Sequence, residues 1–421
     1  MPGWTMSELA ELLPRLRSRV EYFDYLDGYS VTTADELRER RTTRGVGKTY
    51  MLETVGRSRP APSLPSIFER MGLGMAAVEE GVLYRISDPG LGGDVGLVEL
   101  LNDRHPVLYT LLPAQQSDAW IRRVVQGTPW LDRLWLSARL FNELWRWVQA
   151  TTNPRRFTQL KFDYEAFYET DEQALLDEDD SSLEAASEDV EDREPVARRS
   201  SRFTMADRVE TIQARLGRLQ EIYRPLYSIT QLRIPAAGRG GHDFYFDGKV
   251  TNRSDSFSDH RQNVEFVLQT YRRVTERAED LLWFASGDTA APAGGDGFRL
   301  RGAPVFLEFS ERLGEQTFDR WIDMTFGRRA NRFRLSGYPM RLSRTKVHVY
   351  GVDRHLWQPL MLELTDRHMY VVLPKGTCGN TVHRLVTNVQ RYLDPGVTAW
   401  VGDQRFEDLV EAALPLPPRS A

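Results

Sequence analysis

The chain has 421 residues, of which 41% are hydrophobic and 11% aromatic, so it can bury a large core and is long enough for two or three domains. This composition excludes a collagen, a coiled-coil rod, a disulfide-stabilised miniprotein and a largely disordered protein. The net charge of −5 is unevenly spread, because residues 171–194 hold twelve acidic residues and one arginine and carry −11. The remaining residues together carry +6.

The bulk composition also predicts the compartment. The one cysteine, Cys378, excludes an intrachain disulfide and suits a reducing cytoplasm. No apolar run reaches the roughly 18 residues of a membrane-spanning helix, and the first residues lack the pattern of a secretion signal. Arginine outnumbers lysine by 50 to 5, which is typical of a GC-rich genome. We therefore expect a cytoplasmic, bacterial protein that needs no cofactor and binds no membrane.

Residues 1–165 are predicted to form a mostly helical N-terminal domain with a few strands. Apolar residues recur at three- and four-residue steps over 130–148, which is typical of an amphipathic helix, and strands are expected at 82–86 and 107–112. Four tryptophans lie between positions 130 and 147. A segment this rich in Trp and Leu indicates a packed core or a surface that holds a protein partner.

Residues 166–202 are predicted to be a disordered insert, because dense like charge and low hydrophobicity cannot offset the chain entropy lost on folding. A second α/β module is expected at 203–290, with a strand at 227–234 and a long helix at 260–284. This helix has an apolar stripe at helical spacing, made of Val264, Val267, Leu268, Tyr271, Val274, Ala278 and Leu281.

A C-terminal α/β module is expected at 298–421. Its predicted strands are 305–309, 332–335, 346–350, 359–364, 369–373 and 397–401, and its predicted helices are 311–326, 381–393 and 406–413. The whole chain is therefore predicted to have an α+β or mixed α/β fold, whose C-terminal modules contain a mixed or antiparallel sheet.

Gly47, Lys48 and Thr49 match only the end of a phosphate-binding loop. The complete pattern requires a glycine where this chain has Thr42, and a buried strand where it has a charged helical segment. We therefore do not expect nucleotide hydrolysis at this position.

A candidate anion site lies where the strand at 369–373 leads through a glycine-containing turn into the helix at 381–393. Free backbone amides at a helix N-terminus attract anions, and the helix dipole adds to this attraction. Lys375, Thr377 and Thr381 supply further donors. The turn is thus suited to a phosphate or a carboxylate.

The same turn contains Cys378, which suggests a cysteine nucleophile as an alternative. A thiol near a helix N-terminus has a lowered pKa, and the sequence GTCGN partly matches a nucleophile elbow. The base would be His355 or His383, and Asp353 would orient it. A third interpretation is that the glycines form a tight turn in which Cys378 is a small buried apolar residue.

The predicted strands indicate where the residues of the cysteine-nucleophile hypothesis lie relative to one another. If the strands at 346–350, 359–364 and 369–373 form a meander, the turn at 351–358 and the loop at 374–380 share one end of the sheet. Asp353 and His355 then lie near Cys378, and His368 lies at the opposite end.

Three of the seven histidines occur as Asp-Arg-His, at 103–105, 353–355 and 366–368. Two of these repeats fall at opposite ends of the predicted meander, so they cannot form one metal site. No His, Cys and Asp cluster has the spacing of zinc ligands. We expect no metal.

The most basic segment is 328–346, with seven basic residues and no acidic one: Arg328, Arg329, Arg332, Arg334, Arg341, Arg344 and Lys346. Strand alternation would place Arg332 and Arg334 on one sheet face, near the stacking surface of Tyr338. Such a face suits a nucleic acid backbone. The alternative is a solvated face paired with acids such as Glu308, Glu311 or the insert.

No complete motif identifies a reaction, and whether the chain is an enzyme stays open. The sequence favours a non-catalytic accessory component of a multi-protein bacterial assembly. It would bind a phosphate-bearing ligand, above all a nucleic acid, through the arginine-rich sheet face and the anion site. The alternative is a cysteine hydrolase that uses Cys378.

Overall fold

The computed structural model describes residues 15–39, 45–54, 62–165, 200–282, 285–287, 299–301, 303–326, 333–374 and 376–414. These residues form nine α-helices and two large sheets whose strand pairs are all antiparallel. The predicted α+β fold is confirmed. A separate two-stranded sheet pairs β12 (Ala285–Gly287) with β13 (Arg299–Arg301).

The first sheet combines strands from both halves of the chain. Its spatial order is β2 (Gly74–Glu79), β3 (Leu83–Asp88), β4 (Gly93–Leu100), β5 (Pro106–Thr110), β1 (Lys48–Glu53), β11 (Lys249–Asn252), β10 (Gly241–Tyr245), β9 (Ile229–Pro235), β7 (Phe157–Glu165) and β8 (Ser200–Arg208), with β6 (Asp132–Arg133) also beside β1. The predicted ranges 1–165 and 203–290 therefore share one sheet. The described part of 1–165 contains seven strands, more than a mostly helical domain would have.

Residues 166–199 of the predicted insert lie outside the described residues. Residues 200–202, which were also predicted to be disordered, instead form the start of a strand. Strand β8 begins at Ser200 and pairs with β7 along its whole length.

The second sheet has the order β15 (Leu335–Ser343), β16 (Lys346–Asp353), β17 (Gln358–Thr365), β18 (His368–Val372), β14 (Val305–Glu308), β19 (Thr398–Val401) and β20 (Gln404–Arg405). The expected meander of β16, β17 and β18 is confirmed. Buried residues such as Val347 and Val349 alternate with exposed ones such as Tyr350. One face of this sheet therefore packs on the core and the other faces solvent.

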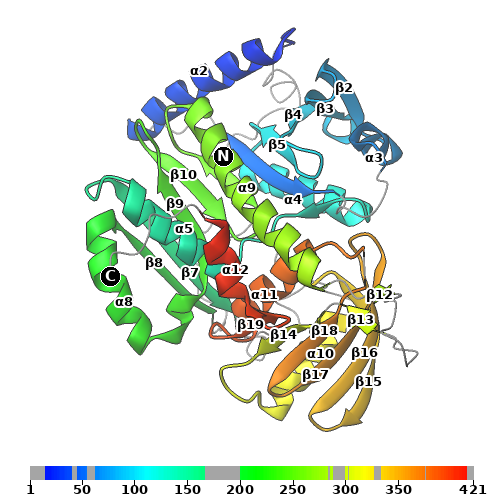
Figure 1. The fold of residues 1–421 in the computed structure, drawn as a ribbon. Coiled ribbons are helices and arrows are strands. Elements are labelled where there is room, and N and C mark those ends of the chain that lie inside the picture. Colours follow the sequence, from blue (N-terminus) through cyan, green and yellow to red (C-terminus); the bar gives the residue numbers. More distant parts are fainter. Residues whose placement is uncertain are drawn as a thin grey trace, which may run out of the picture.

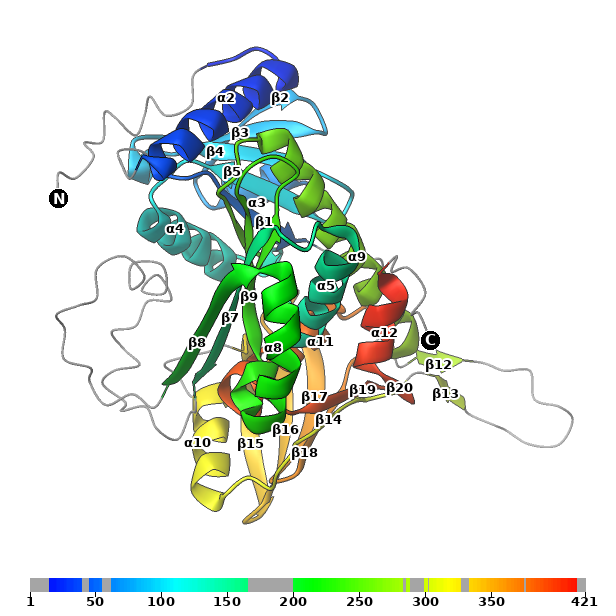
Figure 2. The same ribbon diagram turned by 90° about the vertical axis from the view of Figure 1, so that its left-hand side faces the viewer.

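The helices pack around and between the two sheets (Figures 1 and 2). They are α2 (Arg19–Arg38), α3 (Leu64–Arg70), α4 (Ala114–Gly127), α5 (Ala138–Thr151), α8 (Val209–Ile222), α9 (Phe257–Leu282), α10 (Glu315–Phe326), α11 (Asn380–Tyr392) and α12 (Phe406–Ala413), with short 3-10 turns at Pro89–Leu91 and Arg224–Tyr227. Helix α9 contacts β10 and β11 of the first sheet and β19 of the second. Among the described helices, none combines the length and the apolar composition needed to cross a bilayer.

The predicted apolar stripe explains the position of α9. Its members from Val264 to Ala278 are fully buried, and they belong to a hydrophobic core that includes residues of both sheets. The start of α9 is fixed by Asp27 of α2, whose carboxylate accepts hydrogen bonds from the amides of Phe257 and Ser258 at 2.6 and 3.1 Å. This cap satisfies amides that have no partner within the helix.

Tryptophans of the segment 130–148 pack in the interior of the protein. Helix α5 begins later than predicted, at Ala138, where Ser137 caps the amide of Leu140. Trp135 and Trp145 are buried in the core, and Trp147 stacks on Phe266 of α9 with ring centroids 4.4 Å apart. These contacts give no support to a protein partner at this segment, which stays a prediction.

Candidate functional site

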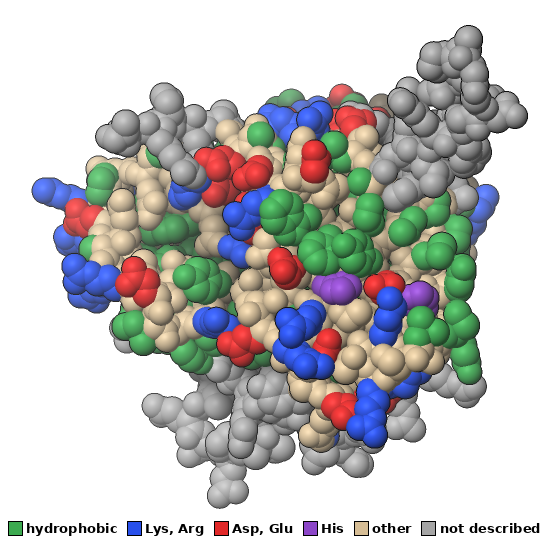
Figure 3. All heavy atoms as spheres, turned by 60° about the horizontal axis from the view of Figure 1, so that its bottom comes forward, with side chains coloured by type: hydrophobic (Ala, Val, Ile, Leu, Met, Phe, Trp, Pro, Cys, Tyr) green, Lys and Arg blue, Asp and Glu red, His purple; other side chains and the backbone are tan. Residues whose placement is uncertain are grey.

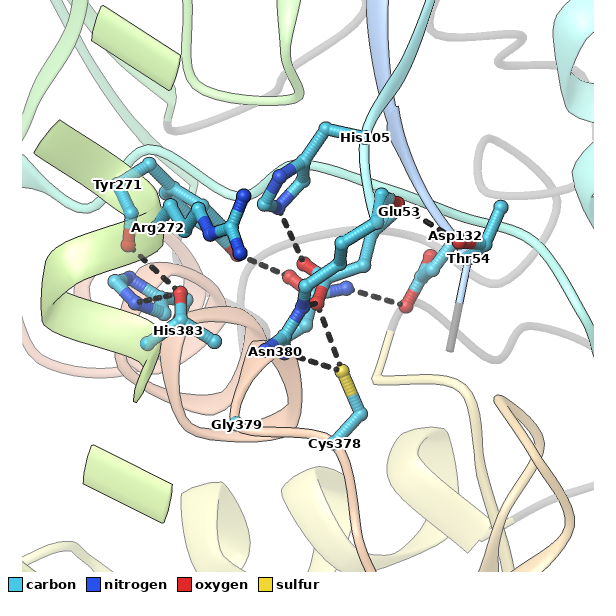
Figure 4. Close-up of polar contacts among 12 residues, drawn as sticks. Glu53, Thr54, His105, Asp132, Tyr271, Arg272, Cys378, Gly379, Asn380 and His383 are labelled. Carbon is cyan, nitrogen blue, oxygen red and sulfur yellow. Dashed lines mark hydrogen bonds and ion pairs between the residues drawn. The ribbon is translucent and has the colours of Figure 1, made fainter. Parts of the chain in front are cut away.

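Cys378 lies buried in the turn between β18 and α11, with 1% of its surface exposed. Its thiol donates a hydrogen bond to Glu53 Oε1 at 3.0 Å, and Arg104 Nη2 donates to the sulfur at 3.2 Å (Figure 4). Burial, followed by the charge of Glu53, raises the pKa of the thiol well above its usual value. This direction is opposite to the lowered pKa that the helix N-terminus predicts, and the thiol is placed as a hydrogen-bond donor to Glu53.

The two candidate bases are engaged elsewhere. The Nδ1 atom of His355 lies 3.1 Å from the carbonyl oxygen of Pro129, and Nε2 of His383 lies 3.1 Å from the hydroxyl of Thr275. Burial lowers the pKa of both rings, to about 3 for His383. Cys378 and these histidines thus share one region without forming the hydrogen-bonded pair that a cysteine hydrolase requires.

Asp353 lies beside the turn, as the meander predicts, but it does not orient a histidine ring. Its carboxylate pairs with Arg384 Nη2 at 2.5 Å and accepts a hydrogen bond from the hydroxyl of Thr381. It also accepts a hydrogen bond from the backbone amide of His355 at 2.9 Å. The carboxylate therefore joins the end of β16 to the first turn of α11.

The predicted anion site exists, but a carboxylate of the same chain fills it. The backbone amide of Gly379, at the start of α11, donates to Glu279 Oε1 at 2.8 Å. The same carboxylate accepts hydrogen bonds from Arg104 at 2.6 and 3.1 Å. Thr377 donates to the carbonyl oxygen of Pro374, and Lys375 lies outside the described residues. Thr377 and Thr381 are thus not free to bind an external phosphate.

Charged and polar side chains from several elements form a connected group, which we call the buried network. Its members are Glu53, Arg104, Asp132, Glu279, Asp353, Cys378, Asn380 and Arg384. Burial by itself would raise the pKa of Glu53, but Arg104 and then His105 lower it well below its usual value. Burial likewise opposes the ionisation of Asp132, yet Arg334 and Arg384 lower its pKa to about 2. The network therefore holds ionised groups inside the protein by pairing them.

Arg334 belongs to this interior and not to an exposed basic face. Its guanidinium donates to Asp132 Oδ1 at 2.8 Å and to the carbonyl oxygens of Leu131 and Val125 at 3.0 and 3.1 Å. The backbone of Arg334 has a φ of 51°, so Arg334 is not part of a strand as predicted, and β15 begins only at Leu335. The predicted placement of Arg334 on an exposed sheet face is wrong.

The other basic residues of the segment differ in their surroundings. Arg341 pairs with Asp319, and Lys346 Nζ lies 2.8 Å from Glu363 Oε2. Arg344 is exposed in the turn between β15 and β16. Arg328, Arg329 and Arg332 lie outside the described residues.

The solvent-facing side of the second sheet carries a second group of residues, which we call the outer face. Strand register aligns them in rows that cross the sheet. Its described members are Ser336, Tyr338, Met340, His348, Tyr350, Val352, Pro359, Met361, Glu363, His368, Tyr370, Val372, Phe306 and Trp400. Figure 3 shows hydrophobic side chains gathered around histidine on this side of the molecule.

Sequence reasoning missed both the acidic half of the buried network and the extent of the outer face. The Asp-Arg-His repeat at 103–105 was a signal for the first, because its Arg104 bridges Glu53 and Glu279. The alternation of Tyr338 and Met340 with smaller residues was a signal for the second.

Two further observations concern the partial phosphate-binding loop and possible metal ligands. Lys48 donates to the carbonyl oxygens of Val46 and Leu112 at 3.0 and 3.1 Å, so its ammonium supports strand β1 and its neighbour. Within the described residues, no three His, Cys, Asp or Glu side chains are grouped so that they can hold a metal ion.

Comparison with known proteins identifies the family. The model of the MJECL33-like protein family matches residues 17–407. The chain belongs to this family. One relative in the MJECL33-like family is an uncharacterised protein, MJECL33, of Methanocaldococcus jannaschii. It is 21% identical over 403 residues, which cover 91% of this chain and 93% of the relative.

The comparisons go no further than the family. No solved structure matches the chain. The relative in the MJECL33-like family comes from an archaeon, so a bacterial source for the present chain stays a prediction.

Proposed function

We propose that this protein is a non-catalytic binding component that binds single-stranded nucleic acid on the outer face. The observation that carries the proposal is an array of exposed and partly exposed aromatic rings on adjacent strands. Bases of a single strand stack on such rings without regard to sequence, and sheet faces with exposed aromatics are a common platform for single strands.

One part of the array crosses β18, β14 and β19. Tyr370, Phe306 and Trp400 are directly opposite one another in the strand register. The ring centroids of Tyr370 and Phe306 are 4.6 Å apart, and Arg405 lies 5.7 Å above the ring of Trp400. This row offers both ring surfaces and a guanidinium that can contact a phosphate or stack on a base.

A second part lies on β15, β16 and β17. Tyr338 and Tyr350 are opposite each other and are 79% and 63% exposed, and Met361 continues their row. Next to them lies a hollow of about 530 Å³ whose lining includes Val352 and Pro359. We propose that an unpaired base enters this hollow, because the bases of a single strand are free to turn away from their neighbours.

Positive charge surrounds the rings at one end of the sheet. Arg344 and Arg367 are exposed in the two hairpin turns at that end, and Lys346 begins the strand beside them. A basic rim beside a stacking surface is complementary to a nucleic acid strand.

The test is fluorescence anisotropy of the full chain with a labelled oligothymidylate of about 20 nucleotides, which has no secondary structure. Saturable binding is expected. Replacing Tyr350 or Tyr370 by alanine should each weaken it by about 5- to 150-fold, the equivalent of one lost stacking contact of about 1–3 kcal/mol.

Tyr223→Ala is the matched control, because Tyr223 is a comparably exposed tyrosine after α8 and is not a member of the outer face. It should bind like the wild type. The proposal is wrong if the wild type shows no saturable binding, or if the control weakens binding as much as the outer-face variants do. Far-ultraviolet circular dichroism establishes that each variant is folded.

A further inference from the structure

The first sheet carries a group of polar side chains on one face of β7, β9 and β10. Helices α5, α8 and α11 pack on the other face, which is apolar and contains the buried side chains of Leu160, Leu232 and Phe244. Figure 2 shows α5 and α8 on one side of these strands. Because side chains alternate along a strand, the neighbouring Lys161 and Gln231 lie on the face opposite to these helices.

Strand register places Lys161, Gln231 and Tyr245 directly opposite one another, on β7, β9 and β10. Gln231 is only 2% exposed, yet its Oε1 atom has no hydrogen-bond partner among the described residues. Buried amides are normally paired, so this one indicates a ligand or an ordered water. Rotation about the last side-chain bond exchanges the two ends of the amide, and Gln231 can therefore present either an acceptor or a donor.

The ammonium of Lys161 is the second unpaired group of this row. The side chain is half-buried, and no carboxylate of the described residues lies within ion-pair distance of it. Burial lowers its pKa, and the carboxylates of Asp243 and Asp163 only partly oppose this effect. The guanidinium groups of Arg253 and Arg202 lower the pKa further. The surroundings of this amine therefore favour an additional negative charge.

The two nearby carboxylates are already paired with arginines. Asp243 accepts hydrogen bonds from Arg233 at 2.6 and 2.9 Å and from Arg253 at 2.8 Å. Asp163 accepts one from Nε of Arg202 at 3.0 Å. With the lysine, the group has four cations and two anions, and it therefore carries an excess of +2.

We propose that this part of the first sheet is a binding site for a phosphate group, held by Lys161, Gln231 and Arg233. A phosphate group carries about −1.5 to −2 at pH 7, which matches the excess charge better than the single charge of a carboxylate does. Lys161 supplies a partly accessible ammonium and Gln231 a buried amide. Arg233 uses Nε and Nη2 for Asp243, so its Nη1 faces no acceptor on that carboxylate. The site lies on another sheet than the outer face and is independent of the proposed function.

The test is isothermal titration calorimetry of the full chain with inorganic phosphate at about pH 8, where the ion carries close to two charges. Saturable binding at a single site is expected. Lys161→Met and Gln231→Leu should each weaken it by roughly 10-fold, as the loss of one hydrogen bond to a charged group would give. Gln231→Leu should leave thermal stability nearly unchanged, because the buried amide it replaces has no partner.

Lys346→Met is the matched control, since Lys346 is paired with Glu363 on the second sheet. It should bind phosphate like the wild type, and acetate should bind the wild type more weakly than phosphate does. Glycerol phosphate distinguishes two sources of the group. Tighter binding than that of inorganic phosphate supports a phosphate ester as the ligand, and equal binding supports the free ion.

Nuclear magnetic resonance locates the site without relying on a variant's stability. The chain has five lysines, so selective ¹³C labelling gives few signals, and Lys161→Met identifies the one from Lys161. Phosphate should shift this signal saturably and raise the pKa of the amine, while the signal of Lys346 stays in place.

Three outcomes would overturn the proposal. The wild type shows no saturable binding of phosphate, the Lys161 signal does not move, or acetate binds as tightly as phosphate. Equal weakening by the Lys346 variant would likewise exclude this site. Far-ultraviolet circular dichroism shows whether each variant is folded.

Discussion

The buried network and the outer face differ in how far their side chains are paired within the protein. In the network, Arg384 meets Asp132 and Asp353, and the helix amide of Gly379 meets Glu279. On the outer face, Tyr338 is left mostly to solvent. The sequence drew attention to charged groups that the fold uses internally. The difference teaches that the density of charge along a sequence does not by itself identify an exposed surface.

The strongest way to break this comparison is to remove one charge from the buried network. Replacing Arg384 by methionine leaves Asp353 buried without its cation and removes one of the two cations that pair with Asp132, the other being Arg334. The free energy of unfolding should fall by about 3–5 kcal/mol, because an uncompensated buried charge is costly. Urea denaturation measures this loss.

Arg344→Met is the control, since Arg344 is an exposed arginine at the rim of the outer face. It should change stability by no more than about 0.5 kcal/mol. Equal losses for the two variants would show that the buried network does not depend on its charges.

The next prediction compares the reactivity of the buried thiol of Cys378 with that of a thiol introduced on the outer face. Cys378 is 1% exposed and its pKa is raised by burial, so Ellman's reagent should label it about 100-fold more slowly in the native protein than in guanidinium. In a Cys378→Ser/Ser336→Cys variant, the new thiol on the outer face should react rapidly in the native state. Rapid labelling of native wild-type protein would return the nucleophile hypothesis to consideration.

The smallest expected effect is a pH dependence of stability that comes from the buried His383. Burial lowers the pKa of His383 to about 3 in the folded chain, whereas an unfolded histidine has a pKa near 6.5. The unfolded state therefore binds more protons between these values. The stabilising contribution is complete above about pH 6.5 and is lost as the pH falls toward 3.

At about pH 5.5 this histidine alone should reduce the free energy of unfolding by about 1.4 kcal/mol. Burial lowers the pKa of His105, His260 and His355 in the same direction, so the wild type should lose more than this. His383→Gln should show a shallower fall between about pH 7.5 and 5.5 in denaturant titrations. An identical slope in both proteins would contradict the assigned cause.

The features that the sequence predicted correctly depend on patterns within short segments of the chain. Strand alternation and short turns place Asp353 beside the loop at 374–380, and its hydrogen bond from Thr381 confirms that placement. The apolar stripe of α9 was visible for the same reason, since a period of 3.6 residues needs no knowledge of distant contacts.

What the sequence did not reveal depends on distant or irregular backbone. Glu53 and Cys378 are 325 positions apart, and no local period relates them. The positive φ of Arg334 ends the alternation that would have turned its side chain outward. The filling of the α11 anion site by Glu279 likewise depends on how α9 packs, which periodicity does not encode.

The hydrogen bond from Arg104 to Cys378 has a consequence for protein synthesis. Its two ends are 274 positions apart, and a ribosome that adds roughly 5–20 residues per second separates their emergence by roughly 15–60 s. During that interval the nascent chain already contains Glu53 and Arg104 but not the turn that completes their contacts. Assembly of the interior therefore waits for the C-terminal region, and a chain interrupted before residue 378 cannot close it.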